Sequence, residues 1–239
     1  MKNKRRMIPS LSSNSVFLGV LLAIVGGFLD AYTYVSRDGV FANAQTGNMV
    51  LLGIRAAQGE WKETVRFIPP ILAFILGVLV AETVKIPRVR AIVYSYRRFV
   101  LILECIVLFI VGALPESVPN MVVTVCIAFV SSMQISTFNK LDKWNYNSTV
   151  TTGNLRTATQ AAYSAIVERD QEAKNQFKEF ISIILCFLLG ALTGTYLTMH
   201  IGDRAIWIAS ALLIISILLY HSHKGYFRRS KKAMKLDER

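Results

Sequence analysis

Six apolar stretches divide the chain, and each is long enough, or nearly so, to cross a membrane as a helix. They lie at about 15–35, 65–84, 98–114, 119–138, 178–199 and 205–221. A hydrocarbon core of roughly 30 Å requires about 20 helical residues. The pattern therefore predicts an all-α integral membrane protein with six transmembrane helices.

Two further segments, 46–58 and 152–167, have helical composition but are shorter. At about 1.5 Å per residue they reach only roughly 20 to 24 Å. We interpret them as two re-entrant half-helices, each of which enters and leaves the membrane on the same side.

Basic residues distinguish six spans from the alternative in which the two short helices also cross. Cytoplasmic loops carry an excess of Lys and Arg. Six spans place 21 basic residues inside and 5 outside, with Arg156 left at membrane depth, whereas eight spans give 17 and 9. The sequence therefore favours six spans with both termini in the cytoplasm. The basic start before the first apolar run is also typical of a signal peptide, but no small-x-small cleavage site follows it cleanly.

The chain contains an internal repeat. The tripeptide Thr-Gly-Asn opens both short helices, residues 27–34 align with 131–138, and residues 74–79 align with 187–192. Each unit holds three spans, an odd number, so the second unit must enter the membrane in the opposite orientation. We expect one transmembrane domain over 1–239, with inverted 3+3 repeats at about 15–114 and 119–221 and a basic cytoplasmic tail at 222–239.

The starts of the two half-helices form the candidate substrate site. A hydroxyl residue can cap a helix, glycine allows close backbone approach, and free N–H groups carry the positive end of the helix dipole. Two such ends meeting at the midplane would bind an anion or a polar molecule, with the extended segments 39–45 and 145–151 as a polar lining. The alternative is a pair of ordinary N-caps in polar loops. The predicted substrate-binding residues are Asp30, Asn43, Thr46, Gly47, Asn48, Gln134, Thr152, Gly153, Asn154 and Arg156.

Two members of this set carry a charge. A guanidinium at membrane depth costs at least about 2.5 kcal/mol on insertion scales, so Arg156 should face a cavity, a carboxylate or a substrate. Asp30 is its natural partner, and a structural ion pair is the alternative to a substrate contact. Asp30 could instead carry a proton, or lie at a hydrogen-bonded helix end. Glu82 and Glu104 are weaker candidates, because basic residues lie near both in the sequence.

Composition narrows the classes of function. The chain is 53% hydrophobic, with a mean hydropathy of +0.44 and a net charge of +12. Its basic residues fall in short blocks between apolar runs, which argues against a nucleic-acid partner. The three cysteines lie within apolar runs with no second Cys or His close by, so we expect no disulfide, metal site or cofactor. Sequence motifs of hydrolases, nucleotide-binding loops and zinc proteases are missing, which argues against an enzyme.

Three segments of the first repeat carry a family resemblance: 26–31 (GGFLDA), 40–48 (VFANAQTGN) and 50–53 (VLLG). They closely resemble the YoaK family (domain of unknown function 1275) of bacterial membrane proteins, and the likeness spans nearly the whole chain. The resemblance implies a multi-pass protein of the bacterial cytoplasmic (inner) membrane whose activity is unassigned. It supplies no substrate.

These patterns together predict a small secondary transporter of a small anion or a polar, carboxylate-bearing metabolite, with proton coupling through Asp30. A passive channel is the leading alternative, by analogy with the aquaporin layout. A third alternative is a non-transporting scaffold or sensor that recruits a partner through its basic tail, where anionic lipid would also bind. A homodimer is compatible with so small a chain, although nothing in the sequence fixes it.

Overall fold

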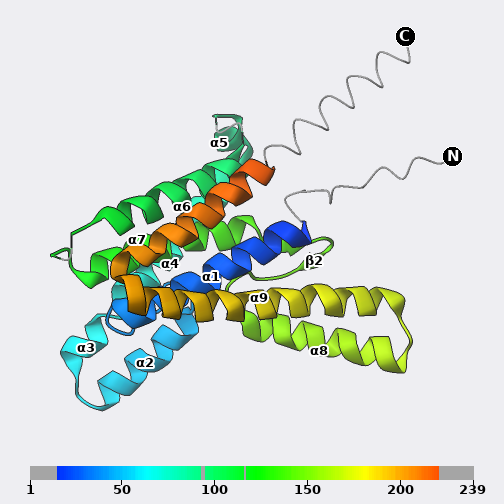
Figure 1. Ribbon diagram of the computed structural model, residues 1–239, viewed down its shortest axis with the longest axis horizontal. Helices are drawn as coiled ribbons and strands as arrows, with labels where there is room; N and C mark the ends of the chain where they lie inside the picture. Colours follow the sequence, from blue (N-terminus) through cyan, green and yellow to red (C-terminus); the bar gives the residue numbers. More distant parts are fainter. Residues whose placement is uncertain (1–14, 93–94, 116, 221–239) are drawn as a thin grey trace, which may run out of the picture.

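Helices account for most of the computed structural model, which describes residues 15–92, 95–115 and 117–220 (Figure 1). The basic tail over 222–239 lies outside the described residues. The described helices are α1 (Val16–Ser36), α2 (Gln45–Ala57), α3 (Trp61–Val65), α4 (Ile68–Lys85), α5 (Pro87–Ile92), α6 (Tyr96–Ala113), α7 (Asn120–Thr137), α8 (Thr151–Val167), α9 (Gln171–Ile201), the 3-10 turn η1 (Gly202–Ala205) and the last helix, residues 206–220. Strands β1 (Lys140–Leu141) and β2 (Trp144–Asn145) form a two-residue antiparallel hairpin in the loop before α8.

Each predicted apolar stretch coincides with a helix, and the two short helices begin and end within one residue of the expected positions. Four helical segments in the described part of the chain are long and apolar enough to cross a membrane: Val16–Ser36, Trp61–Lys85, Asn120–Thr137 and Gln171–Tyr220. The last of these joins α9, η1 and the last helix. Helix α6 has 18 residues that include two arginines and a glutamate. The six-span count therefore stays a prediction.

Two differences from the expected boundaries have simple causes. Helix α9 begins at Gln171, seven residues before the expected start, because Asp170 caps it by accepting a hydrogen bond from the Glu172 N–H at 2.8 Å. The polar first two turns of α9 carry no apolar signal, so hydropathy alone misses them. The short helices α3 and α5 were not expected either, because single turns leave no periodicity to detect.

Large apolar side chains remain exposed along the outer faces of the long helices. On α4 they include Leu72, Leu76 and Leu79, which are 53%, 56% and 58% exposed, and α9 presents a similar row. Apolar surface this continuous is not compatible with water on all sides. The molecule is a membrane protein.

Two tight helix crossings organise the core. Helix α1 crosses α9 at Gly27 and Gly190, where an added Cβ would overlap the backbone oxygens of Phe187 and Ile24 respectively. Helix α4 crosses α7 at Gly77, where a Cβ would overlap the Phe129 oxygen. Small residues of this kind let helix backbones touch directly in membrane proteins. In both crossings a helix of one repeat unit packs against a helix of the other.

The remaining long helix of one unit also packs against the remaining long helix of the other. Helix α6 lies against the last helix, and both contribute to the largest cluster of buried apolar residues. Ser210 Oγ donates to the Cys105 carbonyl at 3.1 Å, and Trp207 Nε1 donates to the Phe109 carbonyl at 3.1 Å. The Phe109 and Trp207 rings also stack, with their centroids 5.9 Å apart.

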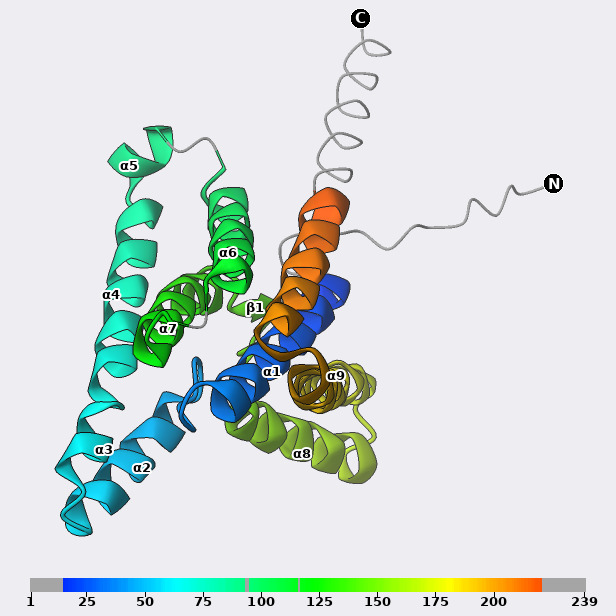
Figure 2. The same cartoon turned by 60° about the vertical axis from the view of Figure 1, so that its left-hand side comes forward.

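Helices α2 and α8 begin near the middle of α1 and lead away in opposite directions (Figures 1 and 2). Each short helix runs back toward the end of the molecule at which the loop before it begins. Arg66, at the start of α4, donates to the Asp38 carbonyl beside the end of α1 at 3.0 Å. Lys143, before α8, forms an ion pair with Glu172, after it. At the other end of α4, Lys85 Nζ donates to the Ser136 carbonyl of α7 at 2.8 Å.

Candidate functional site

The loop before α2 runs back along α1 from its carboxyl end to its middle. Ala42 N–H donates to Thr33 Oγ1 at 3.0 Å, and Asn43 N–H donates to Asp30 Oδ1 at 2.7 Å. The Asn43 side-chain amide then donates to the Gly26 carbonyl at 3.3 Å. These acceptors follow one another at steps of three or four residues, which is one turn of helix each. The loop therefore follows a single face of α1 for about two turns.

The loop before α8 follows α1 from the opposite end. Leu141 and Tyr146 pack at Gly19, where an added Cβ would lie 2.6 Å from Leu141 Cδ1. Thr149 and Ser148 pack at Gly26, where a Cβ would lie 2.6 Å from Thr149 Cγ2.

The two loops meet at Gly26, the central residue of α1. A helix of 21 residues is about 31 Å long, close to the thickness of a hydrocarbon core. Gly26 thus lies roughly 15 Å from either end of the helix. We call this place the Gly26 junction, and it comprises Gly26, Asp30, Asn43, Ser148 and Thr149.

The Gly26 junction holds buried polar atoms that have no hydrogen-bond partner among the described residues. They are Asp30 Oδ2, Asn43 Oδ1 and Ser148 Oγ. The three residues are only 5%, 1% and 1% exposed. Buried polar atoms are rarely left unpaired, and each exception suggests a bound water, ion or ligand. Two of these atoms are acceptors only, so they suit a species that donates hydrogen bonds.

Asn48 and Asn154, the last residues of the two Thr-Gly-Asn tripeptides, make the same contact in both units. Asn48 Oδ1 accepts from the Phe41 N–H at 2.9 Å, and Asn48 Nδ2 donates to the Phe41 carbonyl at 2.8 Å. Asn154 likewise accepts from the Asn147 N–H at 3.2 Å and donates to the Asn147 carbonyl at 2.5 Å. Each amide therefore clamps the backbone of its loop seven residues back, in the manner of a neighbouring strand.

Replacing Asn48 with alanine should lower the free energy of unfolding by about 1 to 2 kcal/mol, because the Phe41 N–H and C=O lose their partner away from bulk water. Asn154→Ala should have an effect of similar size. Asn48→Asp, which still accepts but no longer donates, should fall between alanine and the wild type. Thermal melting of the purified protein in detergent measures all three. Equal stability of Asn48→Ala and the wild type would contradict the clamp.

The expected capping by Thr46 and Thr152 is wrong. The N-cap positions are held by Ala44 and Val150, and neither helix has a side-chain cap hydrogen bond. The N–H groups directly before each short helix are instead bonded by a residue outside that helix, Asp30 in the first unit and Asn147 in the second. Asn147 Oδ1 accepts from the N–H groups of Thr149 and Val150 at 2.9 and 3.2 Å.

The two glycines of the tripeptides differ in surroundings. Gly47 packs against the Phe41 ring, where a Cβ would lie 3.0 Å from Cδ2. A Cβ at Gly153 would meet nothing within 4 Å. Close approach to a neighbouring group therefore requires a glycine only in the first unit.

The expected ion pair between Arg156 and Asp30 is also absent from the described structure. Arg156 is exposed on the surface of α8, whereas Asp30 is buried and accepts from the Asn43 and Ala44 N–H groups. Gln134, the repeat counterpart of Asp30, is buried as well, but it donates to Glu104 Oε2 of α6 at 2.9 Å. Of the predicted site residues, the structure brings Asp30 and Asn43 into direct contact.

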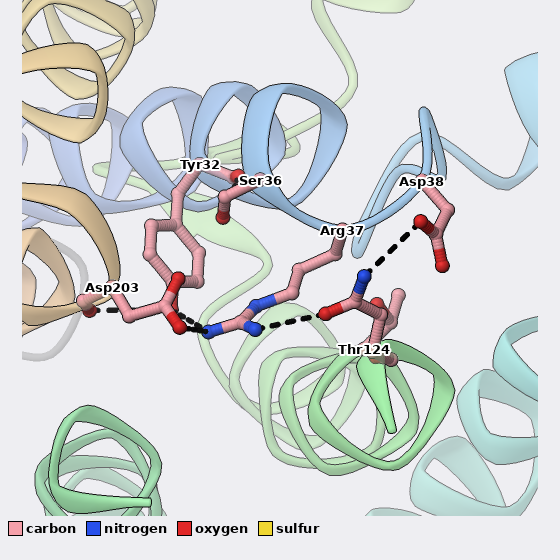
Figure 3. A network of polar contacts seen from close by, with 7 residues as sticks. Tyr32, Ser36, Arg37, Asp38, Thr124 and Asp203 are labelled. Carbon is pink, nitrogen blue, oxygen red and sulfur yellow. Dashed lines mark hydrogen bonds and ion pairs between the residues drawn. The ribbon is translucent and has the colours of Figure 1, made fainter. Parts of the chain in front are cut away.

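A polar network that the sequence patterns did not reveal joins three elements at the carboxyl end of α1 (Figure 3). Arg37, 5% exposed, forms an ion pair with Asp203 of η1 at 2.8 Å. It also donates to Tyr32 Oη at 2.8 Å and to Asn120 Oδ1 of α7 at 2.9 Å. Burial alone would lower the pKa of Arg37, but its hydrogen bond to Tyr32 and the Asp203 charge outweigh burial and raise it. Tyr32 lies five residues before Arg37, but Asn120 and Asp203 are far from it in the sequence, so no run of neighbouring residues could have indicated the network.

A hollow of about 650 Å³ lies beside this network, between the carboxyl ends of α6 and α9. Asp203 lines it together with Arg204 and Trp207. The hollow is therefore at the same end of the molecule as the start of α4 and the loop that leads to the Gly26 junction.

Comparison with known proteins identifies a family and a relative. The model of a family described as "Protein of unknown function (DUF1275)" matches residues 18–219. The UPF0700 transmembrane protein YoaK of Bacillus subtilis (strain 168) is 28% identical over 138 residues, which span 56% of this chain and 61% of that protein. No solved structure matches the chain.

Proposed function

We propose that this chain, which belongs to the DUF1275 family of proteins of unknown function, is a small secondary transporter with its substrate site at the Gly26 junction. The observation that carries the proposal is the meeting of two loops at the centre of α1, beside buried acceptor atoms that have no partner among the described residues. Irregular backbone at the depth of a membrane is tolerated where it lines a polar cavity, and interrupted helices of this kind form the substrate sites of many transporters.

Six spans with two re-entrant hairpins are the topology we infer for the bilayer. The Arg66 contact with Asp38 and the Lys143 ion pair with Glu172 support it, because each joins the two ends of one hairpin. Two short helices that crossed the bilayer would separate these partners by the thickness of the membrane. The Arg37 network supports the same arrangement by keeping the end of α1 beside the start of α7.

Inverted repeats are the second part of this inference. Helices α1 and α7 are counterparts in the two units, and so are α4 and α9. The crossing of α1 with α9 is therefore equivalent to the crossing of α7 with α4, and glycines at both crossings support the correspondence. The equivalent clamps of Asn48 and Asn154 support it independently. In such an arrangement the site would lie between two units that can rock against each other and open to either side in turn.

A small polar solute that donates hydrogen bonds is the substrate class we propose. Asp30 Oδ1 holds the first loop, which leaves Asp30 Oδ2, Asn43 Oδ1 and Ser148 Oγ to meet the solute. The sequence predicted an anionic substrate because Arg156 was expected to lie at the site. In the structure Arg156 is exposed on α8 and does not contact Asp30. A solute with an amine or hydroxyl groups fits acceptor atoms better than a carboxylate does.

A binding assay tests the site. Purified protein is melted in the presence of small amines, polyols, organic acids and inorganic anions, because a ligand that binds the folded state raises the melting temperature. We expect amines or polyols to score. Asp30→Asn keeps an acceptor for the loop but loses the charge, and should weaken binding at least about tenfold, as expected for one hydrogen bond to a charged group. Gln160→Ala, on the exposed face of α8, is the matched control. A panel in which only acids and anions score would contradict the substrate class.

A passive channel is the second candidate, because two loops that meet head to head at one residue also suit a pore. Flux into liposomes distinguishes the two candidates. A carrier should exchange labelled solute against unlabelled solute inside, and Asp30→Asn should lose concentrative uptake. A pore would show downhill flux in both proteins and no stimulation by internal solute.

A further inference from the structure

We propose that Glu104 binds a proton at the interface of α6 and α7, and that this proton drives the transport inferred above. The proposal rests on that function for its role in coupling, but the proton site itself can be tested separately. Its basis is a completely buried carboxylate that has no cation partner among the described residues, with Oε1 unpaired there and the Ser131 hydroxyl close by.

Glu104 occupies the centre of α6 and is 0% exposed. Gln134 Nε2 of α7 donates to its Oε2 at 2.9 Å, while Oε1 has no partner among the described residues. Ser131, one turn before Gln134 on α7, is 1% exposed, and its Oγ also lacks a partner in the described structure. Gln134 and Ser131 therefore present one amide and one hydroxyl on the same side of α7.

No cation forms an ion pair with Glu104 in the described part of the chain. The ionisable groups on the elements around α6 have other positions or partners. Lys85 of α4 binds Glu82, Asp203 of η1 pairs with Arg37, Arg98 of α6 lies over the Tyr220 ring, and Cys105 contacts Ser210. The other ionisable groups on these elements are Cys126 of α7, Arg204 of η1 and Tyr96 and Arg97 at the start of α6.

Asp30 accepts from two backbone N–H groups, whereas Glu104 has neither a cation nor a backbone donor among the described residues. A buried carboxylate in that position is costly, and it reduces the cost by taking up a proton. Glu104 Oε1 takes up a proton from a hydronium ion of the aqueous phase, which is left as water, and the neutral acid can then donate to Ser131 Oγ. Oε2 keeps its hydrogen bond from Gln134, so one proton satisfies both unpaired atoms. A metal ion would need more oxygen ligands, and no group of three His, Cys, Asp or Glu residues lies together in the described chain.

The position of Gln134 connects this site to the Gly26 junction. Asp30 and Gln134 are repeat counterparts on α1 and α7, but only Asp30 holds the loop that follows its helix. In the second unit the polar residue is turned toward α6. Loss of the proton would leave a charge at the α6 and α7 contact, which favours a rearrangement that admits water. The proton would thus shift one unit relative to the other.

Infrared spectroscopy of the purified full chain tests the proton site without any substrate. The wild type should show the carbonyl stretch of a protonated carboxylic acid, with a downshift in deuterium oxide. Glu104→Gln, whose amide resembles the neutral acid in shape, should lose this band, and Glu104→Asp should move it. Asp30→Asn, the control at the other buried carboxylate, should keep the Glu104 band. A band unchanged in Glu104→Gln, or absent from the wild type at acidic pH, would overturn the proposal.

Liposome uptake then tests the coupling, with a solute found in the melting assay. Glu104→Gln should keep solute exchange but lose accumulation driven by a pH gradient. Accumulation by Glu104→Gln that still follows the pH gradient, or wild-type accumulation driven by a sodium gradient alone, would overturn the coupling role. If the wild type transports no solute but the band is present and lost in Glu104→Gln, the proton site stands and the proposed transport function fails.

Discussion

Replacing Gly190 with alanine should destabilise the protein by about 3 kcal/mol, at the upper end of the range for overpacked cores. The added methyl group would overlap the backbone oxygen of Ile24, and a backbone cannot move aside as a flexible side chain can. Helices α1 and α9 would have to separate along their whole contact. Gly77→Ala should have a similar effect at the crossing of α4 and α7, where the Phe129 oxygen is in the way.

Thermal melting in detergent, with size-exclusion chromatography to detect aggregation, measures this effect. Gly53→Ala is the matched control, because Gly53 lies in helix α2 with open space around it. Alanine there should raise stability by up to about 1 kcal/mol, through better helix propensity alone. If Gly190→Ala melted at the wild-type temperature, the direct backbone contact between α1 and α9 would be wrong.

Replacing Arg37 with methionine should cost about 3 kcal/mol, the lower end of the range for breaking a buried ion pair. The partner Asp203 keeps 27% of its side chain exposed, which lets water compensate part of the loss. Tyr32 and Asn120 would each lose a charged hydrogen bond at the same time. Three elements that now meet at one guanidinium would lose their connection.

Chemical unfolding of the purified protein in detergent measures this loss. Arg37→Lys keeps the charge but cannot reach all three partners at once, so it should retain only part of the stability. Arg55→Met removes an ion pair with Glu60 whose two side chains are 44% and 41% exposed, and it should change stability by less than about 1 kcal/mol. Equal losses for Arg37→Met and Arg55→Met would contradict a structural role for the buried network.

The long helices, the short helices α2 and α8 and the family could be predicted from the sequence, because hydrophobic stretches and a repeated tripeptide are local signals. The short helices α2 and α8 lie within one residue of their expected bounds for this reason. The family expected from residues 26–53 is confirmed by a match over 18–219. The repeat predicts that the starts of the two half-helices converge at the membrane midplane, and this stays a prediction. The contact of both preceding loops with Gly26 of α1 was not predicted.

The side-chain partners could not be predicted, because a contact across the fold leaves no trace in local composition. Asn48 was expected to supply a helix start, but its amide reaches back seven residues to Phe41. Arg156 was expected to be drawn to Asp30 by charge, yet the hydrogen bonds of two backbone N–H groups take that place. Glu104 was a weaker candidate because basic residues lie near it in the sequence. Its burial against Gln134 follows only from the packing of α6 on α7.

The packing of α1 against α9 also bears on how the protein is made. Helix α1 leaves the ribosome long before α9, the helix it packs against most closely, and both loops that cover the middle of α1 are synthesised in between. Until α9 arrives, the face of α1 that carries Gly27 lacks its packing partner, and contacts this distant in sequence form slowly. A nascent chain that stops before residue 190 should therefore be an unassembled intermediate, recognised by membrane proteases or held by insertion chaperones.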